Sequence, residues 1–294
     1  MTTARRLRAG ALAHQDQFAH YAARKTAAAL AATLPLLVTD FDLAVDNLPA
    51  IGNAWTRRRF DGGFYLSPAV NPDWPACSLV FVQSVDGNTG TPSPAALGGG
   101  ATDTHVIYEG LSQVTADAVL AGADTVRGGD VVFGVWHPHL VRMRTALGQP
   151  RYPIQIVATL HGMDLDAPML FNLPELRVQV ITIAAGAYKM HDQLKARPWI
   201  QPIVMKRAED LPRVFEALRR AGVARISAVG GRHLATQLID AGLVQDLYVT
   251  TSPRPGGEAD TPFYPGSLPA RVLVRKHGTG ADAGVTFEHR VLLN

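Results

Sequence analysis

Short apolar runs alternate with amphipathic segments from residue 78 onward. The run at 78–85 ends in Ser84-Val85-Asp86-Gly87, which is typical of a buried strand followed by a turn. Comparable runs predict further strands at 117–121, 154–159, 178–183, 203–205, 226–229 and 246–251. Helical periodicity predicts helices at 103–114, 210–221 and 232–241, with Asp103 as the N-cap of the first.

Strands that alternate with helices indicate βαβ units, and βαβ units build a mostly parallel sheet. The last two apolar runs, 271–276 and 285–292, have no helical segment between them and predict an antiparallel pair. We therefore expect an α/β fold whose mostly parallel central sheet is flanked by helices.

The first 75 residues have a different pattern. Residues 1 to about 50 are rich in Ala and Leu at a loosely helical spacing, and Pro35 should end or bend that helix. Residues 50–77 are punctuated by Gly and Pro and carry aromatic residues, so an irregular connector is expected. It should pack on the main domain or, alternatively, cover a substrate pocket. This divides the chain into a helical and irregular extension (1–75) and a main domain (76–294).

Composition narrows the class of protein. Of 294 residues, 47% are hydrophobic and 18% are charged, which excludes wholesale disorder. The formal net charge is +3, and the one tight basic run, Arg57 to Arg59, is expected on a solvated surface, with phosphate binding as the alternative. No basic face with interleaved aromatic residues is found, so no nucleic-acid partner is predicted. The single cysteine, Cys77, excludes an intrachain disulfide and lies in an apolar run that predicts burial. We find no secretory signal and no membrane-spanning run, and we expect a cytoplasmic protein.

The candidate chemistry lies at strand ends, because ligands of open α/β sheets bind beyond the carboxyl ends of the strands. Gly230 and Gly231 follow the strand at 226–229, and they let the backbone approach a ligand closely. The next helix offers free N–H groups to a phosphate, and Arg232 lies in its first turn. An ordinary strand-to-helix turn uses the same glycines, so this motif alone leaves both interpretations open.

Two other strand ends add candidates for the same ligand. Gly122 and Thr125 follow the strand at 117–121, where a hydroxyl and N–H groups can hold a pyrophosphate or a ribose. A helix N-cap is the alternative role for Thr125. Thr159 and His161 end the strand at 154–159 and are candidate donors to the 2′-phosphate of a dinucleotide.

The strand end at Ser84 and Asp86 is a candidate catalytic element. A carboxylate in a cleft can orient a substrate or relay a proton, although an Asp-Gly turn needs no function. His105 and Glu109 share one helical face and are expected on the exposed surface. No metal site is expected, because His137 and His139 have no carboxylate-rich partner. No Gly-x-Ser-x-Gly elbow occurs, which disfavours a serine hydrolase.

Four stretches together resemble the reductase domain of riboflavin biosynthesis, which has a dihydrofolate-reductase-like fold. They are SLVFVQSVDGNTG (78–90), ADAVLAGADTVRGGD (116–130), IQIVATLHGMDLDAPMLF (154–171) and AVGGRHLATQLIDAGLVQDLYVTTSPRPGG (228–257). The resemblance covers residues 78 to about 292 and leaves out the first 75.

The resemblance implies a homodimer that uses NADPH to reduce a phosphoribosylaminopyrimidine, 5-amino-6-(5-phosphoribosylamino)uracil, to its ribityl form. The cofactor would carry the hydride, and the protein would align donor and acceptor. The residues implied to contact the cofactor are Gly122, Thr125, Gly230, Gly231 and Arg232. Ser84 and Asp86 would face the substrate and the nicotinamide.

The chain departs from that family in three respects, one of which is that no deaminase zinc signature precedes the reductase region. Val229 stands where a Glu usually precedes the paired glycines. A loop that usually reads Asp-Asp-Pro and ends in a phosphate-binding Arg is here residues 128–136, where only Asp130 corresponds, and Asp130 is kept as the third catalytic candidate. Phe133 and Trp136 of this loop suggest a flatter, more apolar substrate. Two alternatives therefore stay open: a reductase of the same fold for another C=N substrate, such as a pterin or a cyclic imine, and a non-catalytic nucleotide-binding protein.

Overall fold

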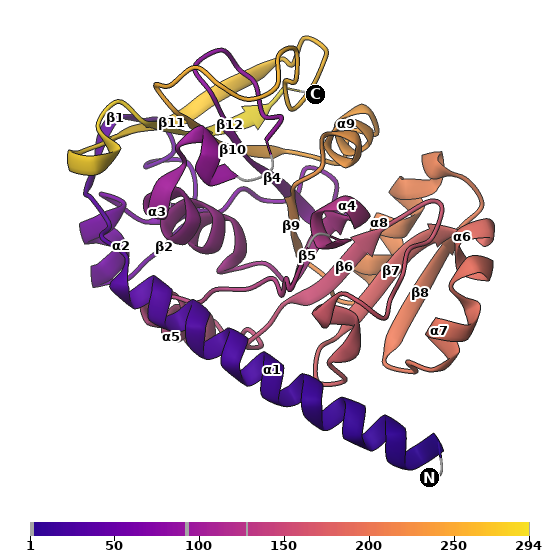
Figure 1. The fold of residues 1–294 in the computed structure, drawn as a ribbon. Coiled ribbons are helices and arrows are strands. Elements are labelled where there is room, and N and C mark those ends of the chain that lie inside the picture. The colour runs from indigo at the N-terminus through magenta and orange to yellow at the C-terminus, as the bar shows by residue number, and fades with distance from the viewer. Residues whose placement is uncertain (1–2, 92–93, 128, 294) are drawn as a thin grey trace.

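A single ten-stranded sheet forms the centre of the molecule (Figure 1). The computed structural model describes residues 3–91, 94–127 and 129–293, and of residues 3–14 and 94 it describes only the backbone. In spatial order the strands are β1 (Leu37–Asp42), β11 (Ala270–Gly278), β12 (Thr286–Leu292), β10 (Asp246–Thr251), β4 (Ala76–Gln83), β9 (Arg225–Val229), β5 (Ala118–Gly122), β6 (Ile154–Ala158), β7 (Val178–Ile183) and β8 (Ile200–Met205).

The strands from β10 to β8 run parallel, as the alternation of strands and helices predicted. Strand β12 returns antiparallel to β10, and β11 pairs antiparallel with β12, which confirms the predicted C-terminal pair. The expected α/β fold with a mostly parallel sheet is therefore confirmed.

Each face of the sheet has its own hydrophobic core. Neighbouring residues of one strand point to opposite faces, so Leu79 of β4 packs with one core and Val80 with the other. Helices α8 (Leu211–Arg220) and α9 (Arg232–Asp240) cover the Leu79 face. The Val80 face is covered by α1 (Thr3–Ala31), by α5 (Pro138–Ala146) and by a continuous helix formed by α3 (Gly100–Thr102) and η2 (Asp103–Gln113). Burial on both faces explains why these strands are almost uniformly apolar.

Shorter elements complete the chain. They are α2 (Ala54–Arg59), β2 (Ala50–Ile51), β3 (Phe64–Tyr65), η1 (Pro94–Leu97), α4 (Ala123–Arg127), η3 (Met169–Asn172), α6 (Ala184–Lys189), α7 (His191–Lys195), η4 (Ala208–Asp210) and η5 (Gly280–Asp282). Within the described part of the chain, no helix is both long enough and apolar enough to traverse a bilayer.

The first 75 residues contribute to the same sheet. Helix α1 ends at Ala31, and strand β1 then pairs antiparallel with β11 at the sheet edge. The segment at 50–77, which was expected to be irregular, contains helix α2 between the paired strands β2 and β3. Asn53 caps α2 by accepting hydrogen bonds from the backbone N–H groups of Trp55 and Thr56. The proposed boundary near residue 75 stays a prediction.

Cys77 is buried in β4, as predicted, and this burial raises the pKa of its thiol. A second buried group, the Arg144 guanidinium of α5, fixes the segment that joins η2 to β5. Its Nη1 donates to the carbonyl oxygens of Gln113, Val114 and Ala116, and its Nε donates to that of Pro150 at 2.6 Å. The cation therefore satisfies carbonyl groups that water cannot reach.

Replacing this cation should destabilise the fold strongly. We expect Arg144→Met to lower the free energy of unfolding by about 3 kcal/mol, because it leaves several buried carbonyl oxygens without a donor. Arg142→Met, two residues away on the exposed side of α5, is the matched control and should change it by less than about 0.5 kcal/mol. Urea denaturation of both variants measures the difference, and equal midpoints would contradict this assignment.

Candidate functional site

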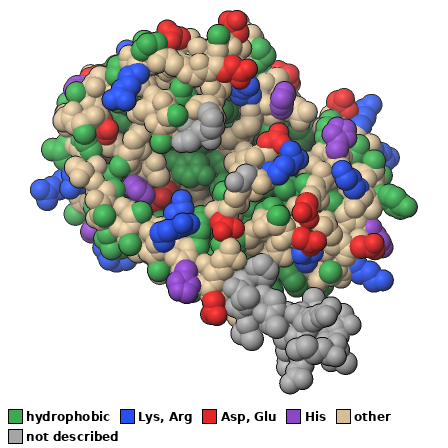
Figure 2. Space-filling model, viewed as in Figure 1, with side chains coloured by type: hydrophobic (Ala, Val, Ile, Leu, Met, Phe, Trp, Pro, Cys, Tyr) green, Lys and Arg blue, Asp and Glu red, His purple; other side chains and the backbone are tan. Residues whose placement is uncertain are grey.

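A cavity of about 1260 Å³ opens at the carboxyl ends of β4 and β9. Figure 2 shows this face of the molecule hollowed, with hydrophobic side chains at the bottom of the hollow. The lining side chains and backbone come from α1, β4 and its following loop, η1, η2, α4, the loop at 129–133, the turn into α9, and the loop at 257–258. They are Lys25, Val80, Phe81, Val82, Thr89, Gly90, Thr91, Leu97, Asp103, Tyr108, Asp124, Thr125, Gly129, Asp130, Val131, Phe133, Val229, Gly230, Gly231, Arg232, His233, Gly257 and Glu258. The volume exceeds that of a typical small-ligand pocket.

The turn between β9 and α9 is built for close approach of a ligand. Gly230 and Gly231 have φ values of +65° and +81°, a backbone region that favours glycine. A Cβ atom on Gly230 would lie 2.8 Å from Oγ1 of Thr125, so a side chain there would collide with α4. Gly231 is the N-cap of α9 and provides no capping side chain, which leaves the first N–H groups of the helix available to an anion.

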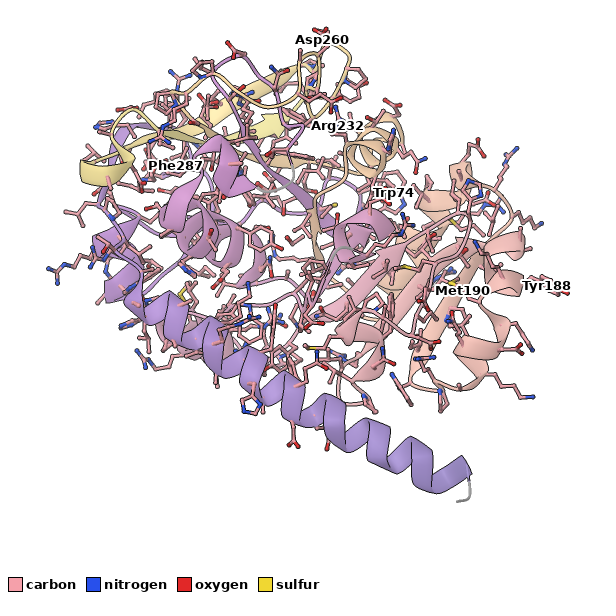
Figure 3. The ribbon with its side chains drawn as sticks, viewed as in Figure 1. Trp74, Tyr188, Met190, Arg232, Asp260 and Phe287 are labelled. Atoms are coloured by element: carbon pink, nitrogen blue, oxygen red, sulfur yellow. The ribbon has the colours of Figure 1, made fainter. Side chains whose placement is uncertain are left out.

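Arg232 adds a positive charge to this corner. Its guanidinium lies 4.0 Å from the Glu258 carboxylate and is partly exposed. Figure 3 shows Arg232 at the start of α9, below the loop that carries Asp260. Backbone amides, an open glycine corner and an arginine together match the shape and charge of a dinucleotide diphosphate, so the residues present fit that group.

Asp103 is the buried carboxylic acid of the cavity. The residue is only 5% exposed, and its Oδ1 accepts a hydrogen bond of 2.6 Å from the Thr250 hydroxyl of β10. The pKa of Asp103 is raised to about 7, chiefly by burial; the Thr250 hydrogen bond opposes this shift, and the nearby charge of Asp282 adds to it. The group therefore exchanges its proton near neutral pH.

The predicted N-cap role of Asp103 is wrong. The residue lies inside the continuous helix of α3 and η2 with helical backbone angles, and its side chain points to β10 rather than to its own helix. In the sequence, Asp103 is a polar residue that precedes an apolar helical pattern, which is typical of an N-cap. Only the packing of η2 on the sheet shows that Asp103 is buried. Helix η2 has π-helical hydrogen bonding, a geometry frequent at functional sites.

The exposed positions predicted for His105 and Glu109 are also wrong, because both side chains are buried. Glu109 Oε1 lies 3.1 Å from His105 Nδ1, and its Oε2 accepts from the backbone N–H groups of Trp136 and His137 at 2.8 and 3.4 Å. Gln155 of β6 fixes the same loop, since it exchanges two hydrogen bonds with the backbone of Phe133. These buried side chains hold the loop that forms one wall of the cavity.

The structure brings half of the predicted site residues to the cavity. Those that line it are Thr125, Asp130, Gly230, Gly231 and Arg232. Asp130 is exposed at the rim, and its carboxylate accepts a 3.0 Å hydrogen bond from Gln17 of α1. Sequence reasoning missed Lys25, because the resemblance did not include the N-terminal extension.

The other predicted site residues lie outside the cavity lining. Ser84 is buried, and its hydroxyl accepts from the backbone N–H of Asn88, which stabilises the turn that carries the exposed Asp86. Gly122 ends β5, and Thr159 and His161 follow β6. Their functional roles stay predictions. Among the described residues, no three His, Cys, Asp or Glu side chains gather as a metal site would require.

The raised pKa of Asp103 should make stability depend on pH. A carboxyl group with a higher pKa in the folded state contributes stability below its unfolded pKa of 3.8, and this contribution is lost as the pH rises through about 7. The unfolding free energy of Asp103→Asn relative to the wild type should therefore increase by up to about 4 kcal/mol from about pH 4 to about pH 8. Urea titrations across this range test the shift, and parallel pH profiles of the two proteins would contradict it.

The fold is shared with several solved structures. A pyrimidine reductase-like protein from Corynebacterium diphtheriae is 21% identical with a TM-score of 0.59, over 75% of this chain and 92% of that chain. The riboflavin biosynthesis reductase Rib7 of Saccharomyces cerevisiae is 17% identical with a TM-score of 0.52, over 76% and 92%. RibD of Acinetobacter baumannii is 17% identical with a TM-score of 0.57, over 75% of this chain but only 58% of its own length. These similarities confirm the dihydrofolate-reductase-like fold.

No curated protein sequence matches the chain. The family model of the RibD C-terminal domain matches residues 75–284, which include every strand that borders the cavity and most of its lining. On this match the chain belongs to the RibD C-terminal domain family.

Proposed function

We propose that the protein is an NADPH-dependent reductase of the riboflavin-pathway type, which reduces 5-amino-6-(5-phosphoribosylamino)uracil to its ribityl form. The observation that carries this proposal is one cavity that combines the Gly230–Gly231 corner with the buried acid Asp103. Membership of the RibD C-terminal domain family supports it, as does the shared fold with a riboflavin biosynthesis reductase.

The glycine corner holds the diphosphate of the cofactor. The N–H groups at the start of α9 would donate to the phosphate oxygens, Arg232 would neutralise their charge, and Thr125, whose Oγ1 lies beside Gly230, would offer its hydroxyl. Gly122, Thr159 and His161 remain candidates for further cofactor contacts at the neighbouring strand ends. When bound, the nicotinamide supplies the hydride.

Asp103 supplies the proton. Reduction of a C=N group takes up one hydride and one proton: the hydride adds to the carbon, the electron pair of the broken π bond goes to the nitrogen, and the nitrogen, which stays bonded to that carbon, takes the proton. Burial raises the pKa of Asp103 to about 7, so a large fraction of the molecules carry the proton near neutral pH, and Thr250 orients the carboxyl group. The side chains of Val80, Val82 and Phe133 add apolar surface to the lining of the same cavity. The resemblance adds the proposals of a homodimer and of a cytoplasmic enzyme, with Ser84, Asp86 and Asp130 as substrate contacts.

A second candidate is a reductase of the same fold that acts on a pterin or a cyclic imine. The apolar and aromatic lining of the cavity, which includes Leu97, Tyr108 and Phe133, favours a flat substrate. Stereospecific hydride transfer to such an acceptor, without turnover of the phosphoribosylaminopyrimidine, would select this alternative. NADPH binding without hydride transfer to any of these acceptors would instead select a non-catalytic nucleotide-binding protein.

The proposed diphosphate site at Gly230 and Gly231 can be tested by placing a negative charge there. NADPH at about 100 times its dissociation constant should stabilise the wild type by roughly 2.7 kcal/mol. Gly231→Asp should lose this stabilisation, because a carboxylate would stand where a phosphate binds. Gly242→Asp is the matched control, since Gly242 has a similar φ of +66° at the other end of α9. It should keep the NADPH stabilisation, and a folded Gly231→Asp variant that also keeps it would refute the placement.

The proton donor can be tested by kinetics. Asp103→Asn should lower kcat by about 100- to 10,000-fold, because the amide has no acidic proton to donate. It should keep the NADPH stabilisation, because the amide has nearly the same shape as the carboxyl group. The wild-type kcat should fall as the pH rises through about 7, where Asp103 loses its proton, and the residual activity of the variant should lack that limb. Wild-type activity in Asp103→Asn would exclude the role.

A further inference from the structure

Helix α1 brings a positive charge to the cavity from outside the matched domain. The family match begins at residue 75, whereas α1 spans Thr3–Ala31 and carries Lys25 into the cavity lining. Among the described lining residues, Lys25 and Arg232 are the two that bear a Lys or Arg charge. Arg232 belongs to the diphosphate corner, so Lys25 marks a second positive position.

Helix α1 is docked firmly on the wall of the cavity. Phe18 and Tyr21 are buried, and the Tyr21 ring meets the edge of the Trp136 ring at a centroid distance of 5.4 Å. The Phe18 ring packs on Tyr152 at the same distance. Figure 1 shows the helix running along one side of the molecule, past the loop that precedes α5. This buried aromatic contact gives α1 a fixed position relative to the cavity.

One face of α1 follows the wall loop toward the cavity. Gln17, Tyr21 and Lys25 are four residues apart and therefore share that face. Gln17 Nε2 donates to Asp130 Oδ2 at 3.0 Å, and the Tyr21 hydroxyl accepts from the backbone N–H of Val132 at 3.3 Å. Lys25 continues this row by one turn and reaches the cavity, where no carboxylate of the described residues forms an ion pair with it.

We propose that Lys25 binds a phosphate group of the substrate, so that the N-terminal helix completes the substrate site. This rests on the proposed function, because it names the substrate class of the same cavity as a phosphate ester. A lysine ammonium binds phosphate as a compact point charge, and the docked helix holds it at the rim. The loop at 129–136, which forms the adjacent wall, contains no Lys or Arg of its own.

The test compares three variants. Lys25→Gln removes the charge and Lys25→Arg keeps it, while Arg24→Gln is the matched control. Arg24 is exposed, lies 5.7 Å from the Tyr21 ring as Lys25 does, and does not line the cavity. Kinetics are measured with 5-amino-6-(5-phosphoribosylamino)uracil and with its dephosphorylated riboside. Thermal unfolding of each variant checks that α1 remains docked.

We expect Lys25→Gln to raise KM for the phosphorylated substrate about tenfold, the effect of losing one charge-assisted hydrogen bond. Its kcat and its KM values for NADPH and for the riboside should stay within about twofold. Lys25→Arg should restore most of the affinity, and Arg24→Gln should behave as the wild type. An unchanged ratio of the two KM values in Lys25→Gln would overturn the assignment of Lys25.

If the proposed function itself is wrong, the wild type would turn over neither the phosphoribosylaminopyrimidine nor its riboside, and this outcome is distinguishable from an unchanged KM ratio. Binding of ribose 5-phosphate to the protein saturated with NADP⁺ decides the role of Lys25 in that case. Stabilisation of the wild type and of Arg24→Gln that is lost in Lys25→Gln supports a phosphate site. Equal stabilisation of all three proteins, or none, refutes it.

Discussion

Strand β9 pairs in parallel with β4 on one side and with β5 on the other, and this double pairing sets the position of the cavity. The three strands end at the same edge of the sheet, so the segments that follow them meet there. Because β9 ends in two glycines with positive φ, the chain turns at once into α9 and leaves the backbone open to a ligand. Thr125 fills the space that a side chain on Gly230 would need.

The wall opposite this corner depends on contacts between distant parts of the chain. The loop at 129–137 has no regular structure of its own, and four of its backbone N–H groups donate to the side chains of Glu109, Gln155 and Tyr21. Those three side chains belong to η2, β6 and α1. The cavity is therefore shaped jointly by residues 75–284, which match the family model, and by the N-terminal helix α1, and a change in α1 acts on the wall through Tyr21 and Gln17.

The cavity also separates two kinds of electrostatic environment. At the α9 corner, partly exposed amides and Arg232 attract negative charge without burying it. Asp103, by contrast, lies against β10 with one hydrogen-bond donor, and burial there favours the protonated acid. An anionic ligand at the α9 corner and a protonated carboxyl group at Asp103 can thus occupy one cavity.

The fold class followed from the sequence, because strands buried on both faces are continuous apolar runs and glycines mark the ends of helices. The positions of β4, β9 and β10 and the antiparallel C-terminal pair were predicted to within a few residues. The Gly230–Gly231 turn was also identified, since a strand, two glycines and a helix form a local motif. Each of these features is determined by residues that are adjacent in the sequence.

Only the tertiary structure decided the rest. The edge strand β1 has no clear pattern and forms because β11 offers it a partner. Asp103 and Glu109 resemble surface residues in the sequence, and their burial follows from the packing of η2 on the sheet. Lys25 reaches the cavity because aromatic packing seats α1 against residues more than a hundred positions away. The local sequence pattern thus determined the strands and the Gly230–Gly231 turn. The placement of Lys25 and Asp103 in the cavity depends instead on contacts between distant parts of the chain, which no local pattern encodes.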